Sequence, residues 1–230
     1  MMNSKQKTFR QCLRRGFSMV ELLAVIAIIS VMAVLIGVAL GGGNESVALG
    51  NAQRIASSIF QSARSVAVLK QTPTRVIIYG DNGSQTDPSK FLRYIGVVYD
   101  DPDTAAVDWV GVNAGTYLPE GVYFMPDSRP SSLVDATGGN MQSSNFNNSS
   151  STDNISFPVR SGAAENFYYY EFDSNGMSEN PGGTFVIHSG RKSGEDEVTV
   201  DNEFAVAGFA IRRIGGVTLF NDYEEIDALN

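Results

Sequence analysis

Residues 14–29 read RRGFSMVELLAVIAII, and the sequence stays apolar from there to Leu40. Between Leu22 and Leu40 the only polar side chain is Ser30. An α-helix rises about 1.5 Å per residue, so a helix over residues 17–40 is long enough to cross a hydrocarbon layer of roughly 30 Å. The stretch therefore predicts a membrane helix that begins close to residue 17.

Glu21 is the one ionisable residue inside this apolar segment. A carboxylate near the end of a membrane helix is costly unless it is paired, which makes it a candidate for function. A neighbouring basic side chain such as Arg15 is one conceivable partner. Two general explanations of the segment are a signal anchor and a secretory signal peptide that is cut after its apolar region. Neither requires a glutamate at this place.

The run Arg15-Gly16-Phe17-Ser18-Met19-Val20-Glu21-Leu22-Leu23 resembles the cleavage and methylation motif of type IV prepilins and type II secretion pseudopilins. In that family prepilin peptidase removes a basic leader that ends in glycine, and the next residue becomes the N-methylated start of the mature chain. The resemblance implies a leader over residues 1–16, cleavage between Gly16 and Phe17, and methylation of Phe17. It also implies that Glu21 meets the N-terminus of a neighbouring subunit during assembly.

Charge is distributed unevenly along the chain. Residues 1–16 contain five basic residues and no acidic one, and the first charge after the apolar segment is Glu45. By the positive-inside rule, the N-terminus lies in the cytoplasm and the rest of the chain in the periplasm or outside the cell. Without the leader, 12 basic and 25 acidic residues would remain, a net charge of −13. Such a charge disfavours binding to nucleic acid.

Cysteine chemistry is excluded from the mature region. Cys12 is the only cysteine, and it lies in the predicted leader. A chain that begins at Phe17 would therefore have no disulfide, no thiol nucleophile and no thiolate metal ligand.

A second helix is predicted over residues 44–71. Gly41-Gly42-Gly43 predicts a break, because each glycine costs about 1 kcal/mol in a helix, and Asn44 can cap a new helix at its N-terminus. Apolar residues then recur at helical spacing: Ala48, Ala52, Ile55, Ile59, Ala63 and Val66. Pro73 predicts the end near Gln71. This two-part helix resembles that of pilins, and Ala63-Arg64-Ser65-Val66-Ala67 is similar to the minor pseudopilins of the GspH and FimT type.

Residues 74–230 predict a β-rich globular domain. The expected strands cover residues 74–80, 90–100, 107–112, 121–125, 155–160, 166–172, 184–189, 197–200, 203–211 and 217–220. Residues 131–154 are dominated by serine, asparagine, glycine and aspartate, which predicts a mobile loop. The predicted fold is therefore α+β and pilin-like, with a long N-terminal helix, half membrane and half amphipathic, packed on an antiparallel sheet.

Residues with catalytic or metal-binding potential are few. His188 is the only histidine and lies in a predicted strand without a nucleophile motif, which favours a structural role. The acidic clusters Asp100-Asp101-Asp103 and Glu195-Asp196-Glu197 are candidate calcium ligands, although neither follows an established calcium loop. No other cofactor is expected, and the chain is not predicted to be an enzyme.

Two further groups of residues are candidates for binding a partner. Tyr168, Tyr169 and Tyr170 alternate across a predicted strand, so they predict either an exposed aromatic contact or burial under the serine-rich loop. Arg191-Lys192 and Arg212-Arg213 are the basic doublets of the mature region. Some FimT-like pilins bind DNA through basic C-terminal residues, but the acidic tail after Arg213 opposes this here.

These observations lead to one main prediction and two alternatives. The resemblance implies a minor pilin or pseudopilin precursor of the bacterial inner membrane, a structural subunit of a type II secretion pseudopilus or a type IV pilus. Its expected partners are other pilin subunits, prepilin peptidase, the inner-membrane assembly platform and membrane lipid, with nucleic acid disfavoured. The alternatives are a DNA-binding minor pilin and a membrane-anchored envelope protein that does not polymerise.

Overall fold

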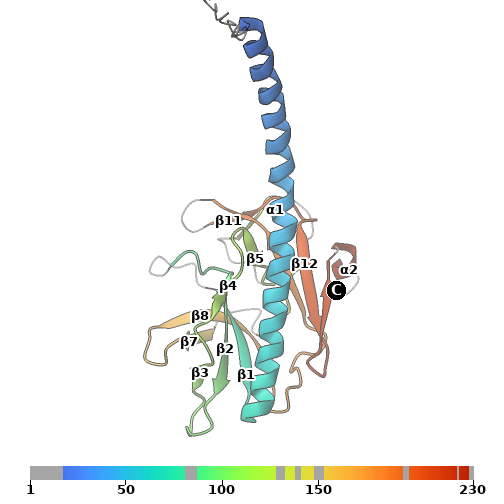
Figure 1. The fold of residues 1–230 in the computed structure, drawn as a ribbon. Helices are drawn as coiled ribbons and strands as arrows, with labels where there is room; N and C mark the ends of the chain where they lie inside the picture. Colours follow the sequence, from blue (N-terminus) through green and yellow to red (C-terminus); the bar gives the residue numbers. More distant parts are fainter. Residues whose placement is uncertain are drawn as a thin grey trace, which may run out of the picture. The chain divides into compact units, whose positions relative to one another are not determined.

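The computed structural model describes residues 18–80, 87–127, 133–137, 141–147, 153–193, 197–221 and 223–227, except for the side chains of residues 33–44 and 227. The chain divides into two compact units, Met1–Gly43 and Asn44–Asn230. The second unit contains all the strands (Figure 1).

Helix α1 (Met19–Lys70) belongs partly to each unit. Its backbone is helical through residues 41–44, so the break predicted at Gly41–Gly43 is wrong. Each glycine costs about 1 kcal/mol, but a helix that already exists on both sides of these glycines does not have to be nucleated again. The continuous helix therefore extends through them. The predicted end is confirmed, since Gln71 adopts a left-handed conformation with φ of 55° and Pro73 follows.

In the second unit, α1 buries a stripe of small side chains together with one large one. Its fully buried apolar residues are Ala52, Ala56, Phe60, Ala63 and Ala67. The predicted stripe is therefore displaced by about one residue, because Ile55 and Ile59 lie at the edge of this face and are only partly buried. Alanine at most of these positions lets the helix backbone approach the sheets closely. The Phe60 ring fills the space between the helix and the two sheets.

The largest sheet is antiparallel and has the order β3-β2-β1-β8-β7, with β4 also paired to β2. Its strands are β1 (Thr74–Tyr79), β2 (Tyr94–Asp100), β3 (Trp109–Gly111), β4 (Thr116–Tyr117), β7 (Asp153–Ser156) and β8 (Ala164–Phe172). Alternate residues of β1 enter two separate cores. Val76 and Ile78 belong to the core that includes α1, whereas Ile77 and Tyr79 pack with Phe157 on the other face.

Two smaller sheets complete the unit. One is antiparallel, with the order β13-β12-β9-β5, and the other has the order β10-β11-β6, in which β11 and β6 are parallel. Their strands are β5 (Val122–Phe124), β6 (Leu133–Asp135), β9 (Thr184–Ser189), β10 (Arg191–Lys192), β11 (Val198–Val200), β12 (Val206–Ile211) and β13 (Val217–Phe220), and a short helix α2 (Tyr223–Asp227) comes after them. The fold is thus α+β with mainly antiparallel sheets, as predicted.

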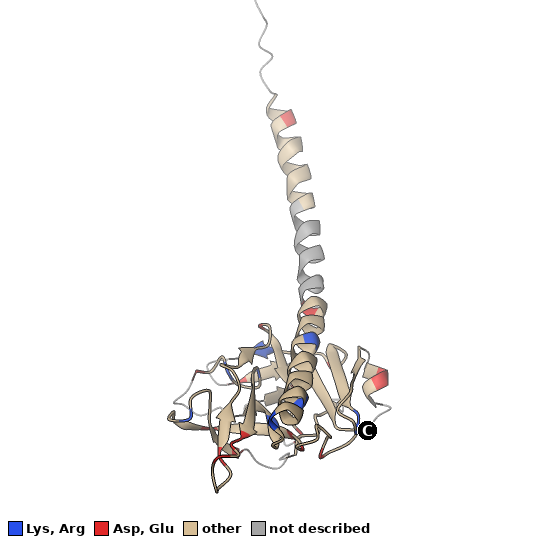
Figure 2. Cartoon of the chain, turned by 60° about the horizontal axis from the view of Figure 1, so that its bottom comes forward, with Lys and Arg blue, Asp and Glu red and all other residues tan. Residues whose placement is uncertain are grey.

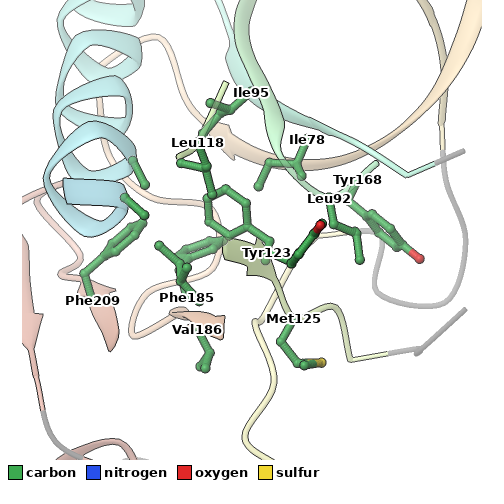
Figure 3. Close-up of a cluster of buried hydrophobic side chains, with 14 of the residues drawn as sticks. Ile78, Leu92, Ile95, Leu118, Tyr123, Met125, Tyr168, Phe185, Val186 and Phe209 are labelled. Carbon is green, nitrogen blue, oxygen red and sulfur yellow. The ribbon is translucent and has the colours of Figure 1, made fainter. Parts of the chain in front are cut away.

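Phe60 joins the helix to both antiparallel sheets. Its ring centroid lies 5.6 Å from that of Tyr170 in the large sheet, and 4.4 Å and 5.1 Å from those of Phe185 and Phe209 in the smaller one. Figure 3 shows this apolar cluster continuing through Leu118 and residues of β1, β2 and β5. One core therefore holds the second half of α1 and both sheets together.

The loop predicted over residues 131–154 is wrong for the parts that the structure describes. Residues 133–135 form β6, and Met141, Ser144 and Phe146 are buried. The Ser144 hydroxyl accepts a hydrogen bond from Val186 N at 2.9 Å, and Asn147 N donates to Tyr169 O at 2.9 Å. This segment connects the two antiparallel sheets, because its serine and asparagine groups satisfy backbone groups of both.

The positions of most predicted strands are confirmed, although several strands are shorter than expected. Residues 90–93 form a turn before β2, in which Leu92 has φ of 51° and is fully buried. The strand expected over 155–160 ends at Ser156, and the one expected over 203–211 begins at Val206. Strands β4, β6 and β10 and helix α2 were not predicted. All of these are five residues or fewer, which leaves too short a pattern to recognise.

The buried phenol of Tyr170 is expected to make the folded chain less stable at alkaline pH. Burial raises the pKa of its phenol from 10.0 to about 12, and the hydroxyl bonds to Ser178 and, at 2.8 Å, to Asn180 O. Because the folded pKa is the higher one, this stabilisation is complete below pH 10 and is lost as the pH rises to about 12. We expect Tyr170→Phe to remove that part of the decline, measured as the free energy of unfolding between pH 9 and 12. An unchanged slope would contradict the assignment.

Candidate functional site

The N-terminus of α1 is capped by Ser18. Val20 N donates to Ser18 Oγ at 3.2 Å, and the backbone N–H groups of Glu21 and Leu22 donate to Ser18 O at 3.0 and 3.1 Å. A serine in this place satisfies N–H groups that the first helical turn leaves without partners. The helix therefore starts two residues after the predicted cleavage point.

Glu21 lies in the first turn of α1, and its side chain is exposed. It lies three positions after Ser18, the spacing of a capping box, in which the glutamate stabilises the helix start. The partial positive charge of the helix N-terminus also favours a carboxylate there. Glu21 thus has a local structural role available in addition to the predicted intersubunit one.

The residues that would form the processing site lie outside the described residues. Gly16 and Phe17 both precede Ser18, as does Arg15, the other conceivable partner of Glu21. Cleavage between Gly16 and Phe17, methylation of Phe17 and the pairing of Glu21 therefore stay predictions.

The first described part of α1 exposes apolar side chains around its whole circumference. The large apolar residues with at least two-fifths of their surface exposed are Met19, Val20, Leu22, Leu23, Val25, Ile26, Ile28, Ile29, Val31 and Met32. Ser30 interrupts the series, but its hydroxyl donates to Ile26 O at 2.8 Å within the helix. Such a surface is rare on a soluble monomer and is typical of a helix that is covered by lipid or protein.

Over the part of the chain that the structure describes, no helix combines the length and the apolar character needed to cross a membrane. The predicted span over residues 17–40 includes Phe17 and the side chains of residues 33–40, which are outside that part. The membrane helix stays a prediction.

The structure does not bring the candidate calcium ligands together. Asp101 forms an ion pair with Arg160 at 3.0 Å, and Asp100 accepts a hydrogen bond from Asp108 N at 3.0 Å. Asp103 donates its backbone N–H to Asp101 Oδ1 at 3.1 Å. No group of three or more potential ligands converges within the described residues, whereas Glu195 and Asp196 of the second cluster lie outside them. The Asp100-Asp101-Asp103 calcium site therefore stays a prediction, with these residues engaged in the contacts named above.

The basic doublets are exposed and lie on separate hairpins. Arg191 is paired with Asp201, with Nε at 2.8 Å from the carboxylate. Arg212 donates from Nε to Thr218 Oγ1 at 3.1 Å, across the β12–β13 turn. Basic and acidic residues are interspersed over the second unit, as Figure 2 shows. The doublets do not form the continuous basic stripe that favours a nucleic-acid interface.

His188 is fully buried in β9, between Tyr123 of β5 and Val206 of β12. A substrate in solvent has no access to a side chain in that position. Its place in the core agrees with the structural role that the sequence favours.

The three tyrosines of β8 are divided between the two faces of the sheet. Tyr168 and Tyr170 are buried, and Tyr168 stacks on Phe146 with ring centroids 5.4 Å apart. The alternative in which the serine-rich segment covers a tyrosine is therefore confirmed for Tyr168.

Tyr169 is half-buried on the opposite face, beside Arg75. The Arg75 guanidinium lies 3.7 Å from the Tyr169 ring and 4.0 Å from the Trp109 ring. Arg75 is also paired with Glu171 at 2.5 Å and with Asp153 at 3.1 Å. Burial raises the pKa of the Glu171 carboxyl, and Arg75 opposes that shift. Arg75 is thus held by two carboxylates and two aromatic rings, which favours a structural role for this cluster.

The start of α1 has a second signal in the sequence, separate from the cleavage motif and not used in the prediction. Ser18-Met19-Val20-Glu21 has the Ser-x-x-Glu pattern of a helix start, and it places the first turn of α1 correctly.

Comparison with known proteins gives limited similarity. Neither a protein-family model nor a curated protein matches this chain. Among solved structures, the chain is similar to the crystal structure of the type IV minor pilin FimU from Pseudomonas aeruginosa strain PAO1. The two share 15% sequence identity and a TM-score of 0.39 over 75% of this chain and 87% of that one. A similarity at this level establishes neither family nor function.

Proposed function

We propose that this chain is the precursor of a minor pilin or pseudopilin, a structural subunit of a type IV pilus or a type II secretion pseudopilus. In this role prepilin peptidase cuts after Gly16, the new Phe17 amine is methylated, and the apolar part of α1 inserts in the bacterial inner membrane. An assembly platform then adds the subunit to a filament, with the second unit in the periplasm or outside the cell.

The start of α1 carries this proposal. The helix begins at Met19, just after its cap Ser18, and its apolar side chains are exposed on every side from Met19 to Met32. Glu21 is the one acidic residue among them. In a medium of low dielectric constant, a carboxylate attracts a positive N-terminus strongly, so Glu21 would fix the axial position of an incoming subunit.

The second unit supports a structural role rather than a catalytic one. The residues of the second half of α1 pack against two antiparallel sheets, and the only histidine is buried within one of them. DNA binding is disfavoured because the basic doublets are separated and Arg191 is paired with an aspartate. The proposed subunit would contribute surfaces for contact, not reactive groups.

Intact mass spectrometry of the protein recovered from its native membrane tests the proposal. We expect a mature chain that begins at methylated Phe17. A chain that retains residues 1–16, or one that begins beyond Leu40, would contradict processing by the pilin pathway and would favour a simple anchor or a secreted domain.

A further inference from the structure

Two exposed patches of opposite charge lie at the two ends of the β12–β13 hairpin. At the turn, the basic end patch consists of Arg64, Val68, Met177, Arg212, Arg213 and Ile214. At the open end, the acidic end patch consists of Phe204, Tyr223, Glu224 and Glu225. Each patch combines charged groups with apolar side chains that are exposed on the surface of the second unit.

Hydrogen bonds and packing contacts hold the residues of the basic end patch in a defined arrangement. Arg212 and Gly216 close the turn, with Arg212 O accepting from Gly215 N at 2.7 Å. The aliphatic part of Arg64 lies against Gly215, where a Cβ atom would collide with it and where φ is +75°. Ser178 N donates to Arg213 O at 3.2 Å, which attaches the neighbouring turn.

Exposed apolar groups surround these arginines. Ile214 is 70% exposed, Val68 50% and Met177 42%. In the adjoining turn, Asp173 Oδ1 already accepts hydrogen bonds from Asn175 N and Met177 N. A partner for this patch therefore needs acidic groups and an apolar side chain.

The acidic end patch provides those groups on the same chain. Phe204 is 69% exposed, and its ring stacks edge-on against Tyr223 with centroids 5.5 Å apart. Glu224 and Glu225 come next in helix α2, and both side chains are exposed. Figure 1 shows α2 beside β12. Large exposed aromatic residues with a charged rim are typical of protein contact sites.

The two patches point in opposite directions along α1. Gln53 donates to Gly208 O and Phe220 O near the open end, each at 2.7 Å, whereas Arg64 contacts the turn. Gln53 and Arg64 are roughly three helical turns, or about 16 Å, apart along the helix axis. One copy of the hairpin can therefore meet the next copy end to end, along the direction of the helix.

We propose that the basic end patch of one molecule binds the acidic end patch of a second copy of this chain. The contact joins two different surfaces, so it leaves a free patch at each end of the pair and extends into an open row. Arg212 and Arg213 would pair with Glu224 and Glu225, while Ile214 packs against the Phe204 ring. This inference rests on the proposed function, because a filament is what brings copies into such a row.

Cysteine cross-linking of the full-length protein in its membrane tests the contact. In a Cys12→Ser background, we expect the variant with both Ile214→Cys and Phe204→Cys to form a disulfide ladder on mild oxidation. Each single variant is expected to stay monomeric, and the two single variants expressed together are expected to form dimers only. Val107 is 69% exposed, so Val107→Cys paired with Phe204→Cys serves as the matched control.

Charge reversal tests whether the ion pairs themselves are needed, because two cysteines that are merely close together would form a disulfide regardless of these charges. We expect Arg212→Glu with Arg213→Glu to abolish the cross-link, and Glu224→Arg with Glu225→Arg on the partner copy to restore it. Disulfides only between two Ile214→Cys chains, or a yield equal to that of the Val107→Cys control, would overturn the inference. If Phe17 processing and Glu21-dependent incorporation remain normal in that case, only the hairpin contact is wrong, and the proposed function stands.

Discussion

Glu21→Gln is expected to reduce incorporation of this chain into its filament by at least about tenfold, the equivalent of about 1.4 kcal/mol. Glutamine keeps the size of the side chain and its ability to bond to the Ser18 backbone in a capping box. It removes only the negative charge, so the positive N-terminus of the adjoining subunit would be left without its partner. Removing one member of a buried ion pair typically costs about 3–5 kcal/mol. The measurement is the amount of mature protein in sheared filaments relative to membranes.

Two matched variants separate assembly from helix capping. Glu21→Ala removes both the charge and the cap, whereas Ser18→Ala removes the hydroxyl that Val20 N contacts and costs about 1 kcal/mol of helix stability. We expect Ser18→Ala to assemble nearly normally. If Glu21→Gln assembles normally and Glu21→Ala does not, Glu21 serves the helix start only. If all three variants assemble normally, the proposed assembly mechanism is wrong.

Phe60→Ala is expected to lower the free energy of unfolding by about 3–5 kcal/mol, the range for a phenylalanine removed from a packed core. Phe60 is fully buried, and its ring contacts aromatic residues of both antiparallel sheets. The cavity would therefore lie where α1 and the two sheets meet. Denaturant unfolding of the full-length chain in detergent measures the change, with Trp109 as the only tryptophan reporter.

Leu69→Ala on the same helix is the control for this prediction. Leu69 is 82% exposed, so its removal is expected to change the free energy of unfolding by no more than about 0.5 kcal/mol. A loss below about 1 kcal/mol for Phe60→Ala would show that α1 is not part of the cooperative core. An equal loss for both variants would point to helix propensity instead of packing.

The sequence predicted the features that depend on local patterns. The β-branched and aromatic residues of 74–79 and 184–189 predicted β1 and β9, and Pro73 marked the end of α1. The candidate assembly residue Glu21 was recognised because a single acid stands out in an apolar run. Helical periodicity also located the packed face of α1 to within one residue, although Phe60, its largest member, was not assigned to that face.

What the sequence did not reveal depends on contacts between distant segments. Residues 141–147 are mostly polar, and polarity alone predicts a solvated loop, but the Ser144 hydroxyl and Asn147 Oδ1 accept hydrogen bonds from Val186 N and Glu171 N in two different sheets. The parallel pairing of β6 with β11 joins segments more than sixty residues apart, for which no local pattern exists. The three glycines of α1 predicted a break because glycine is a poor helix former locally. The helical segments before and after them keep the helix continuous.

Gln53 and Phe60 together determine how the second unit would respond to a mechanical load. Gln53 attaches the β12–β13 hairpin to α1 through two hydrogen bonds, and the Phe60 ring packs against aromatic residues of both antiparallel sheets. Tension along residues 44–70 would therefore be distributed over both sheets at once instead of peeling one strand. The unit would yield in a single rupture, since neither sheet can release the helix while the other still holds it.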